Sequence, residues 1–403
     1  MNLPINQIIC GDALAELQKL PAESINCCIS SPPYWALRDY GVDGQLGLEP
    51  TFEEYIDKLC TVYDEVKRVL RADGTCWVNL GDTYGTQSGN SRGKDYSGCP
   101  GTYMTNREAG SVLLKGNIQH KCLCLIPQRF TIEMVNRGWI MRNFCVWHKP
   151  NPMPSSAKDR FTVDWEPVFF FVKSKRYAFE PQYEPCLTES NAERPRMGQG
   201  QNTQYKQKRQ DKFRNSSRYV NQGTTPNNSA HSGDVGVSQA SNPLGRNKRT
   251  VWTIPTEARS EAHFATFPQR LVEPMIKAGC PKYVCIKCGK VRVKIWETEI
   301  KSSRYDRGSK SSNFGIKQDV VADHHFKGYT DCGCEAKYRP GIVLDPFMGS
   351  GTVARVAVRL GRDYIGIDLN KQYIEEIAEP FVAEAVTGIS RKERKQGQMG
   401  LFE

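Results

Sequence analysis

Two consecutive prolines end a short apolar strand and limit how the N-terminal part of the chain can fold. Residues 25–30 are mostly apolar and too few for a helix, which is typical of a buried parallel strand. Pro32 and Pro33 have fixed φ angles and no N–H, so neither a helix nor a sheet ladder can continue through them. The chain must therefore leave the sheet here, with the carbonyls of Ser31 and Pro32 directed outward and the ring of Tyr34 beside them.

The residue types at this turn suit transfer of a group to an amine on a planar ring. Carbonyl and hydroxyl acceptors can hold the amine hydrogens out of the ring plane, which makes the nitrogen lone pair nucleophilic, and an aromatic face can hold the ring. Taken alone, the same residues could also form a strand-ending turn with an ordinary buried tyrosine. The turn resembles the Ser-Pro-Pro-Tyr catalytic motif of DNA methyltransferases that modify exocyclic amino groups. Residues 35–41 and 147–154 look like other parts of that family. The resemblance implies catalytic roles for Ser31, Pro32, Pro33 and Tyr34.

Charge and cysteine usage narrow the class of protein. The 403-residue chain has 55 Lys and Arg against 44 Asp and Glu, a net charge of +11, which favours an anionic partner. It shows no apolar run of membrane-spanning length and no signal-peptide pattern at its start, so we expect a cytoplasmic, prokaryotic or phage-encoded protein without a membrane partner. In that compartment the 15 cysteines are expected to be thiols or metal ligands rather than disulfides.

Hydrophobic periodicity predicts alternating strands and helices in the N-terminal part. Asp12 follows the first strand and could be either a helix N-cap or a cofactor contact. The polar stretch 83–117 is long for a connector and could be a loop over a site or simple disorder. We expect strands at 7–10, 25–30, 75–82, 143–147 and 167–172, the last two of which would form an antiparallel hairpin at a sheet edge. We expect helices at 13–20, 52–70 and 127–137, with residues 71–74 stopping the second helix.

A second constellation lies near the C-terminus. The apolar strand 342–345 breaks into a glycine turn before a helix over 353–360, and glycines allow a ligand to approach the backbone closely. The next strand, 364–368, ends in Asp368, whose carboxylate can accept both hydroxyls of a ribose. The turn resembles the S-adenosylmethionine motif, and residues 264–268, before a helix at 269–278, resemble the segment that packs on the methionine portion of this cofactor. The predicted cofactor-binding residues are Asp12, Phe267, Asp345, Phe347, Gly349, Gly351, Thr352 and Asp368.

The order of the two constellations indicates how the chain is divided. A catalytic motif before a cofactor motif is a circularly permuted order and resembles the β class of amino-methyltransferases. This implies an α/β fold, a Rossmann-like methyltransferase sheet with helices on both faces, carrying inserted target-recognition and zinc-binding segments. We expect a catalytic half at 1–180, a basic target-recognition insertion at 181–250, a cofactor half at 251–280 with 341–390, a cysteine-bearing insertion at 281–340 and a tail at 391–403.

The basic insertion has eleven Lys or Arg between Arg194 and Arg249 against two Asp, and few apolar residues. Such a segment cannot build a core, and could either become ordered against phosphates and base edges or remain an exposed flexible insertion. In the family that the chain resembles, target recognition occupies this place. The predicted DNA-binding residues are Lys206, Lys208, Arg209, Lys212, Arg214, Arg218, Arg246, Lys248 and Arg249.

The cysteine-bearing insertion has the spacing of a zinc knuckle. Cys285 and Cys288 are followed by Gly289, and Cys332 and Cys334 come later as a less common C-x-C pair. Four thiolates would complete a closed tetrahedral Zn²⁺ site of structural type. The alternative is a set of free reduced thiols, with substitute ligands available at Cys280, His324 and His325.

These observations predict a site-specific DNA methyltransferase that flips a base out of double-stranded DNA. It would transfer a methyl group from S-adenosylmethionine directly to an exocyclic nitrogen. Within the family, Ser before Pro-Pro-Tyr favours cytosine N4, and adenine N6 is the alternative. A non-catalytic zinc protein that binds DNA is the alternative of another class. A companion restriction endonuclease and a homodimer are both compatible with this prediction.

Overall fold

The structure is a computed structural model that describes residues 3–37, 41–85, 118–184, 246–257, 267–302 and 320–389. The chain divides into two compact units. The first comprises Met1–Gln182, Lys248–Ile295 and Gly328–Glu403, and the second comprises Tyr183–Asn247 and Trp296–Lys327.

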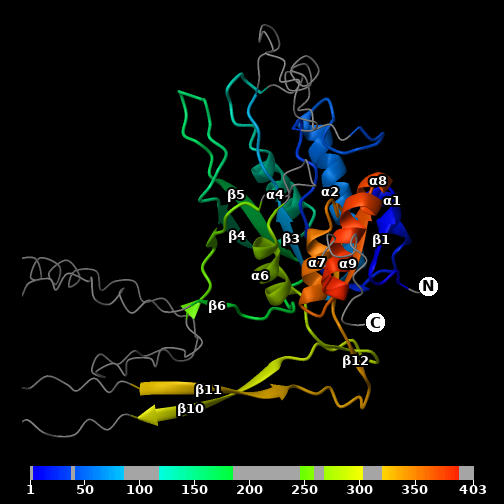
Figure 1. The fold of residues 1–403 in the computed structure, drawn as a ribbon, viewed down its shortest axis with the longest axis vertical. Coiled ribbons are helices and arrows are strands. Elements are labelled where there is room, and N and C mark those ends of the chain that lie inside the picture. Colours follow the sequence, from blue (N-terminus) through cyan, green and yellow to red (C-terminus); the bar gives the residue numbers. More distant parts are fainter. Residues whose placement is uncertain are drawn as a thin grey trace, which may run out of the picture. The chain divides into compact units, whose positions relative to one another are not determined.

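The first unit is built on an eight-stranded sheet with the order β1-β14-β13-β2-β3-β5-β4-β8 (Figure 1). The strands from β1 to β3 in this order are parallel, β5 is antiparallel to both β3 and β4, and β8 is parallel to β4. The predicted antiparallel hairpin is therefore present as β4 and β5, with β8 outside it. The strands are β1 (Gln7–Cys10), β2 (Ile25–Ser30), β3 (Leu70–Asn79), β4 (Ile140–His148), β5 (Trp165–Val172), β8 (Val251–Thr253), β13 (Ile342–Asp345) and β14 (Asp363–Asp368).

The two C-terminal strands lie inside the N-terminal part of the sheet. β13 pairs with β2 (Leu344 with Cys28), and β14 pairs with β1 (Cys10 with Asp368). The backbone N–H of Ile342 donates to the buried Asn26 side chain at 3.0 Å across 316 positions of sequence. The predicted β-α-β unit at the N-terminus therefore has both C-terminal strands between its two strands, and the two halves of the chain form one sheet.

Helices cover both faces of this sheet, as predicted. Side chains of α1 (Ala13–Lys19), α2 (Phe52–Val69) and α4 (Ile126–Asn136) join one buried cluster, and those of α6 (Gln269–Gly279), α7 (Thr352–Arg359) and α9 (Glu379–Thr387) join another. Successive side chains of β2 point to the two clusters in turn: Cys28 belongs to the first cluster and Cys27 to the second. Between β14 and α9 the chain forms α8 (Lys371–Tyr373) and the π-helix Ile374–Ala378.

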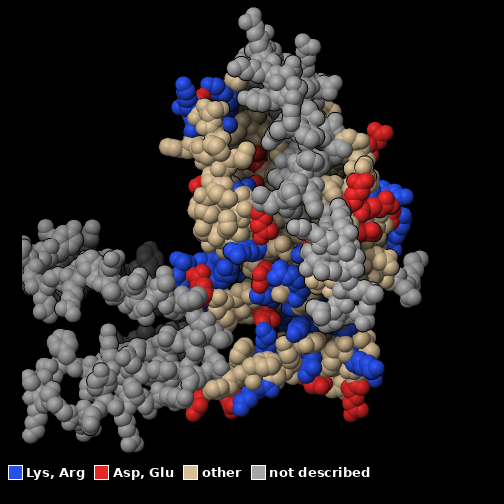
Figure 2. Space-filling view, viewed as in Figure 1, with Lys and Arg blue, Asp and Glu red and all other residues tan. Residues whose placement is uncertain are grey.

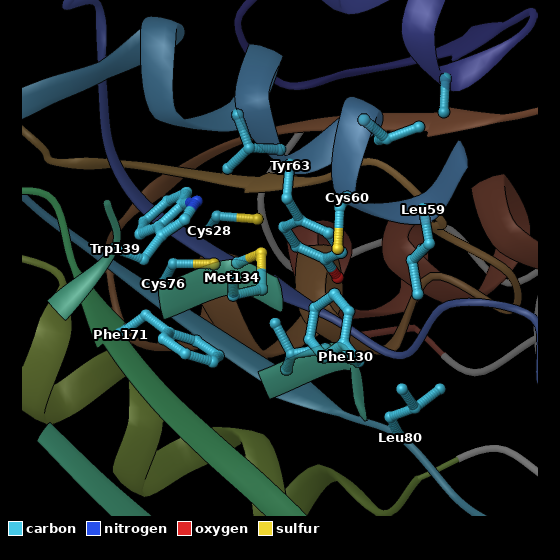
Figure 3. Close-up of a cluster of buried hydrophobic side chains, with 14 of the residues drawn as sticks. Cys28, Leu59, Cys60, Tyr63, Cys76, Leu80, Phe130, Met134, Trp139 and Phe171 are labelled. Atoms are coloured by element: carbon cyan, nitrogen blue, oxygen red, sulfur yellow. The ribbon is translucent and has the colours of Figure 1, made fainter. Parts of the chain in front are cut away.

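The first cluster holds α2 on the strands that lead to the predicted catalytic turn (Figure 3). Tyr63 of α2 makes an edge-on contact with Phe130 of α4, their ring centroids being 5.3 Å apart. Its hydroxyl also lies 2.6 Å from the Oγ of Ser30, the last residue of β2. The end of β2 is thus fixed by a hydrogen bond inside an apolar core, immediately before Ser31.

The largest difference from the predicted boundaries lies between α2 and β3. Helix α2 ends at Val69, and residues 71–74, which we expected to stop the helix, belong to β3. Leu70 is fully buried and already pairs with Ile25, whereas the next pair joins Cys27 to Thr75. Residues 71–74 therefore form a bulge in the ladder, because the two pairs are five positions apart in β3 but only two positions apart in β2.

The described residues also form three small two-stranded sheets. They join β9 (Val284–Cys285) with β12 (Tyr338–Arg339), β10 (Lys294–Ser302) with β11 (Val320–Tyr329), and β6 (Tyr183–Glu184) with β7 (Arg246–Asn247). Most of the predicted 83–117 loop and of the basic insertion lies outside the described residues. Within the described residues, no helix is both long and apolar enough to cross a membrane.

Candidate active site and cysteine cluster

The predicted catalytic and cofactor motifs leave the sheet at the same edge. Strands β2, β3, β13 and β14 are parallel, so their carboxyl ends lie together. The turn at 31–34 follows β2, and the glycine turn at 346–351 follows its direct neighbour β13. The fold therefore brings together two motifs that are more than 300 positions apart in the sequence.

Tyr34 is fixed by polar side chains from two other strands. Its hydroxyl lies 2.9 Å from Oε2 of Glu166 and 3.2 Å from Oδ1 of Asn79, and its proton can be donated to either. The Asn79 amide group donates to Glu166 (3.2 Å) and to the carbonyl of Pro167 (3.0 Å), which fixes its orientation. Ser31 Oγ also lies 3.5 Å from Oδ1 of Asn79. These contacts orient the ring of Tyr34, which is half-buried.

Glu166 also forms an ion pair with Lys149, which follows β4. Burial, followed by the negative charge of Glu166, raises the pKa of the Tyr34 phenol well above its usual value. The hydroxyl is therefore protonated at neutral pH and acts as a hydrogen-bond donor. This favours a role for Tyr34 as an oriented ring rather than as a general base.

Backbone contacts complete the support of this turn. The ring of Tyr34 lies directly against Gly81, where an added Cβ would come within 2.3 Å of the ring carbon Cε2. The Tyr55 hydroxyl of α2 donates to the carbonyl of Pro33 at 2.7 Å, and the indole N–H of the buried Trp35 donates to the carbonyl of Glu49 at 3.0 Å. The carbonyl of Pro33 is thus engaged, and the proposed acceptors are the carbonyls of Ser31 and Pro32.

The glycine turn after β13 is organised by two aspartates. Asp345 accepts from the backbone N–H of Phe347 (3.0 Å), and Asp368, at the end of β14, accepts from those of Gly349 (2.7 Å) and Asn370 (2.9 Å). Gly349 has φ of 51° and Gly351 has φ of 79°, both in the left-handed region that favours glycine.

The two aspartates are suited to a polar, partly cationic ligand. Asp345 is almost fully buried, and its Oδ2 finds no partner among the described residues. Burial raises the pKa of both carboxyls above the ordinary range, and that of Asp345 strongly. A buried carboxylate oxygen without a donor is costly unless a ligand supplies one. The ammonium and ribose hydroxyls of S-adenosylmethionine are donors of this kind, so the residues present fit this cofactor.

The other predicted cofactor residues occupy different positions. Thr352 is the buried first residue of α7, and its hydroxyl lies 3.2 Å from that of Ser350. Phe267 is partly buried and packs on the second core cluster. Asp12 is the N-cap of α1, because its Oδ1 accepts from the N–H of Ala15 at 2.9 Å. The structural interpretation of Asp12 is thus confirmed, and its contact with cofactor stays a prediction.

The four predicted zinc ligands come together. The ligand atoms of Cys285, Cys288, Cys332 and Cys334 all lie within 4.8 Å of one another. Four thiolates at about 2.3 Å from a tetrahedral Zn²⁺ would be about 3.8 Å apart, so small side-chain rotations would suffice. The Tyr338 hydroxyl lowers the pKa of Cys332 to about 6, while the neighbouring Cys288 raises that of Cys334 to about 12.

Among the described side chains, neither Cys280 nor His325 belongs to this group. Cys280 is buried, with its carbonyl accepting from Arg362 at 3.2 and 3.3 Å. His325 lies in the second unit, 3.7 Å from Glu299. The side chain of His324 is outside the described residues.

Only three of the predicted DNA-binding residues are described. Arg246 of β7 forms an ion pair with Glu184 of β6 at 2.8 Å. The Lys248 ammonium lies 5.8 Å from the ring centre of Trp252, and the carbonyl of Arg249 accepts from the indole N–H of Trp252. These contacts are structural. Lys206, Lys208, Arg209, Lys212, Arg214 and Arg218 lie outside the described residues.

Three polar residues of this site were not predicted from the sequence: Asn79, Lys149 and Glu166. Asn79 ends β3 just before Gly81 and Asp82, and a polar residue at the carboxyl end of a parallel strand was an available signal. Asp82 also has a buried oxygen without a partner among the described residues, and burial raises its pKa. Lys149 lies within the family-like segment 147–154, but Glu166 had no such signal, and their meeting depends on the register of β4 and β5.

Comparison with known proteins agrees with this geometry. A sequence model of the family described as DNA methylase, of the N6/N4 type, matches residues 25–291 and 336–379. The chain is 32% identical over 397 residues to the type II methyltransferase M.SfiI of Streptomyces fimbriatus, covering 91% of this chain and 88% of that protein. It is 31% identical over 366 residues to M.Cfr9I of Citrobacter freundii, covering 91% and 84%.

Among solved structures, the PvuII DNA methyltransferase (cytosine-N4-specific) aligns with 95% of this chain and 93% of its own. Its sequence identity is 16% and the TM-score is 0.47. The family match and the two relatives cover most of the chain, including both motifs at the sheet edge. The chain therefore belongs to the N6/N4 DNA methylase family and is an S-adenosylmethionine-dependent DNA methyltransferase.

Proposed function

We propose that the protein methylates the exocyclic N4 of cytosine at specific sites in double-stranded DNA. The observation that carries this proposal is the position of Tyr34. Its ring is oriented by Glu166 and Asn79, its hydroxyl stays protonated, and it belongs to the same short turn as Ser31 and Pro32, whose carbonyls are the proposed acceptors. An amine held by these acceptors needs no charged base to become nucleophilic.

The division of work among the residues follows from this arrangement. Bound S-adenosylmethionine supplies the methyl group. Asp345, Asp368 and the glycine turn would hold that cofactor, and Thr352 and Phe347 would line its place. The carbonyls of Ser31 and Pro32 would orient the amine hydrogens, and Tyr34 would stack on a base that has left the helix. Transfer then needs only alignment of the amine with the methyl group.

The product distinguishes cytosine from adenine as the target. Ser31 favours cytosine through the family resemblance, and adenine N6 is the alternative acceptor. Expression in a host without DNA methylation, followed by mass spectrometry of digested nucleosides, should yield N4-methylcytosine. N6-methyladenine as the sole product would overturn the choice of base and leave the reaction type intact.

We also propose that the cysteine cluster binds one structural Zn²⁺ and that the basic segment 194–249 contacts DNA. Deleting residues 200–240 should abolish methylation of duplex DNA while leaving S-adenosylmethionine affinity nearly unchanged. Unaltered methylation by that variant would place recognition elsewhere. A companion endonuclease would fit the type II relatives, and we propose one of matching sequence specificity.

A further inference from the structure

The segment between β4 and β5 projects from the edge of the sheet that holds the candidate active site. Strand β4 ends at His148, which pairs with Trp165 at the start of β5, and the N–H of Lys149 donates to the carbonyl of Asp164 at 2.7 Å. We call residues 149–164 the arm; it is the green loop above β4 and β5 in Figure 1. β4 runs in the direction of β3, so the arm leaves from the carboxyl edge.

The base of the arm is part of the Tyr34 network. Lys149 begins the arm and forms an ion pair with Glu166, which lies two positions after the end of the arm. The other oxygen of Glu166 lies 2.9 Å from the Tyr34 hydroxyl. The arm and the catalytic tyrosine are therefore fixed to the same carboxylate.

Contacts on both sides hold the arm in place. Asn151 exchanges two hydrogen bonds of 3.0 Å with Thr256, which follows β8. On the returning limb, Asp159 forms an ion pair with Lys121 at 2.6 Å, and the Arg160 guanidinium lies 3.5 Å from the ring centre of Tyr84. Prolines at 150, 152 and 154 stiffen the outgoing limb. An arm held in this way loses little conformational freedom when it binds.

The arm exposes large apolar side chains despite these restraints. Phe161, next to the anchored Arg160, is 96% exposed, the highest value for a large hydrophobic residue in the described part of the chain. Met153 is 84% exposed and Val163 is 53% exposed. Exposed apolar groups on a stiff element commonly mark a contact surface.

The charges around these apolar groups indicate the kind of partner. Lys158 and Arg160 lie on the arm and Lys121 lies beside its returning limb, with Asp159 engaged by Lys121. Figure 2 shows Lys and Arg side chains gathered at the top of this region. A protruding apolar side chain among cations matches a duplex, where phosphates surround stacked bases, better than a purely apolar protein surface.

We propose that the arm enters the DNA duplex beside the target nucleotide and that Phe161 acts as a wedge in the base stack. The inference rests on the proposed function, because a wedge at this edge is useful only if the target base leaves the helix. Proteins that unstack DNA insert Phe, Leu, Ile, Met or Pro side chains between bases. Lys158 and Arg160 would contact phosphates on either side, and Met153 would cover the neighbouring sugar edge.

The test compares Phe161→Ala and Phe161→Trp with Val386→Ala as a matched control. Val386 is an apolar residue on α9 that is 61% exposed. Single-turnover methylation is measured on a paired duplex and on the same duplex with an abasic position opposite the target. Calorimetry with S-adenosylmethionine checks that each variant retains its cofactor site.

The expected result is a defect confined to the paired substrate. Phe161→Ala should methylate the paired duplex about tenfold or more slowly, since aromatic stacking on one base contributes on that order. The abasic duplex should restore its rate to within about threefold of wild type, because no base pair needs to be opened. Phe161→Trp and Val386→Ala should resemble wild type on both.

Other results would overturn the inference. Equal slowing on both duplexes would show that Phe161 does not assist base opening, and unchanged rates would remove it from the DNA contact. A shift to smaller particles in size-exclusion chromatography of Phe161→Ala would instead assign the arm to contact with a second copy of the chain.

Failure of the proposed reaction is distinguishable from these results, since the wild-type protein would then methylate neither duplex. In that case the fluorescence of 2-aminopurine placed beside the target nucleotide tests whether Phe161 enters the base stack. A rise in fluorescence on binding wild-type protein but not Phe161→Ala would support it, and no rise with either would overturn it.

Discussion

The two halves of the candidate active site are built in different ways. The cofactor half is local: Asp345, the glycine turn and Asp368 lie within one strand-turn-helix-strand passage, and their hydrogen bonds join residues at most 19 positions apart. The acceptor half is assembled from distant parts, because Tyr34 meets Asn79 and Glu166 across 45 and 132 positions. A local site can be inferred from a motif, whereas an assembled one requires the register of the sheet.

The largest expected effect tests the local half. Asp368→Ala removes the acceptor for two backbone N–H groups as well as the proposed ribose contact. Hydrogen bonds to a charged group contribute about 1.5–3 kcal/mol each, so we expect S-adenosylmethionine to bind at least about a hundredfold more weakly. Isothermal titration calorimetry measures this directly.

Asp363→Ala is the matched control, because Asp363 begins the same strand at the opposite edge and accepts from Asn6 at 3.1 Å. Its cofactor affinity should equal that of wild type. Equal affinity in a folded Asp368→Ala variant would remove Asp368 from the cofactor site and contradict the local assembly.

Tyr34 tests the assembled half. Tyr34→Ala should lower single-turnover methylation at saturating cofactor about tenfold to a hundredfold, since base stacking contributes roughly 1–3 kcal/mol. Tyr34→Phe keeps the ring and loses only the bond to Glu166 or Asn79, so a cost of about threefold to tenfold is expected. Equal and near-complete inactivation of both variants would show that the phenolic hydroxyl is essential to the chemistry.

The cysteine cluster provides a third, independent comparison. We expect about one zinc per chain, and chelation should loosen the segment around Cys285 and Cys332 before the central sheet unfolds. Metal analysis together with hydrogen exchange measures both effects. Cys288→Ser should lose the metal, whereas Cys122→Ser, which changes an exposed thiol outside the cluster, should keep it. Active enzyme without stoichiometric zinc would refute the assignment.

The smallest expected effect concerns the pH dependence of stability. Burial raises the pKa of Asp345, so the folded protein binds this proton more tightly than the unfolded chain does. Its contribution to stability is therefore lost as pH rises from the ordinary carboxyl range through the raised folded pKa. Asp345→Asn should remove this part of the pH dependence and weaken cofactor binding.

Thermal unfolding of the cofactor-free protein between pH 4 and 8 tests the prediction for Asp345. An unchanged pH profile in Asp345→Asn would mean that the Asp345 carboxyl is not the source of the pH dependence of stability. Saturating S-adenosylmethionine should reduce the difference in the pH dependence of thermal unfolding between wild type and Asp345→Asn only if the ligand supplies the missing donor to Oδ2 of Asp345.

The sequence predicted most elements of the first unit and every member of the cysteine cluster, for physical reasons that can be stated. The strands 25–30 and 342–345 are mostly apolar, and the turn after each is dictated by proline or glycine. The knuckle spacing placed Cys285 and Cys288 within one turn, and β9 and β12 brought the other pair to them.

What the sequence could not predict depends on long-range pairing. Residues 71–74 have the composition of a helix stop, and only pairing of Leu70 with Ile25 shows that they form a bulge. Glu166 reaches Tyr34, and Lys149 reaches Glu166, only because β5 lies between β3 and β4. The exposure of Phe161 is equally invisible in a list of residues.

The position of β13 between β14 and β2 has a consequence for biosynthesis. The edge of β2 that receives β13 is made before its partner, since Asn26 precedes Ile342 by 316 positions. At roughly 5–20 residues per second, a ribosome needs about 15–60 s to produce the missing strand. During that interval β2, whose six residues are all buried in the finished protein, has an open side. The nascent chain is therefore exposed to aggregation and to chaperone binding until residues 342–345 have emerged.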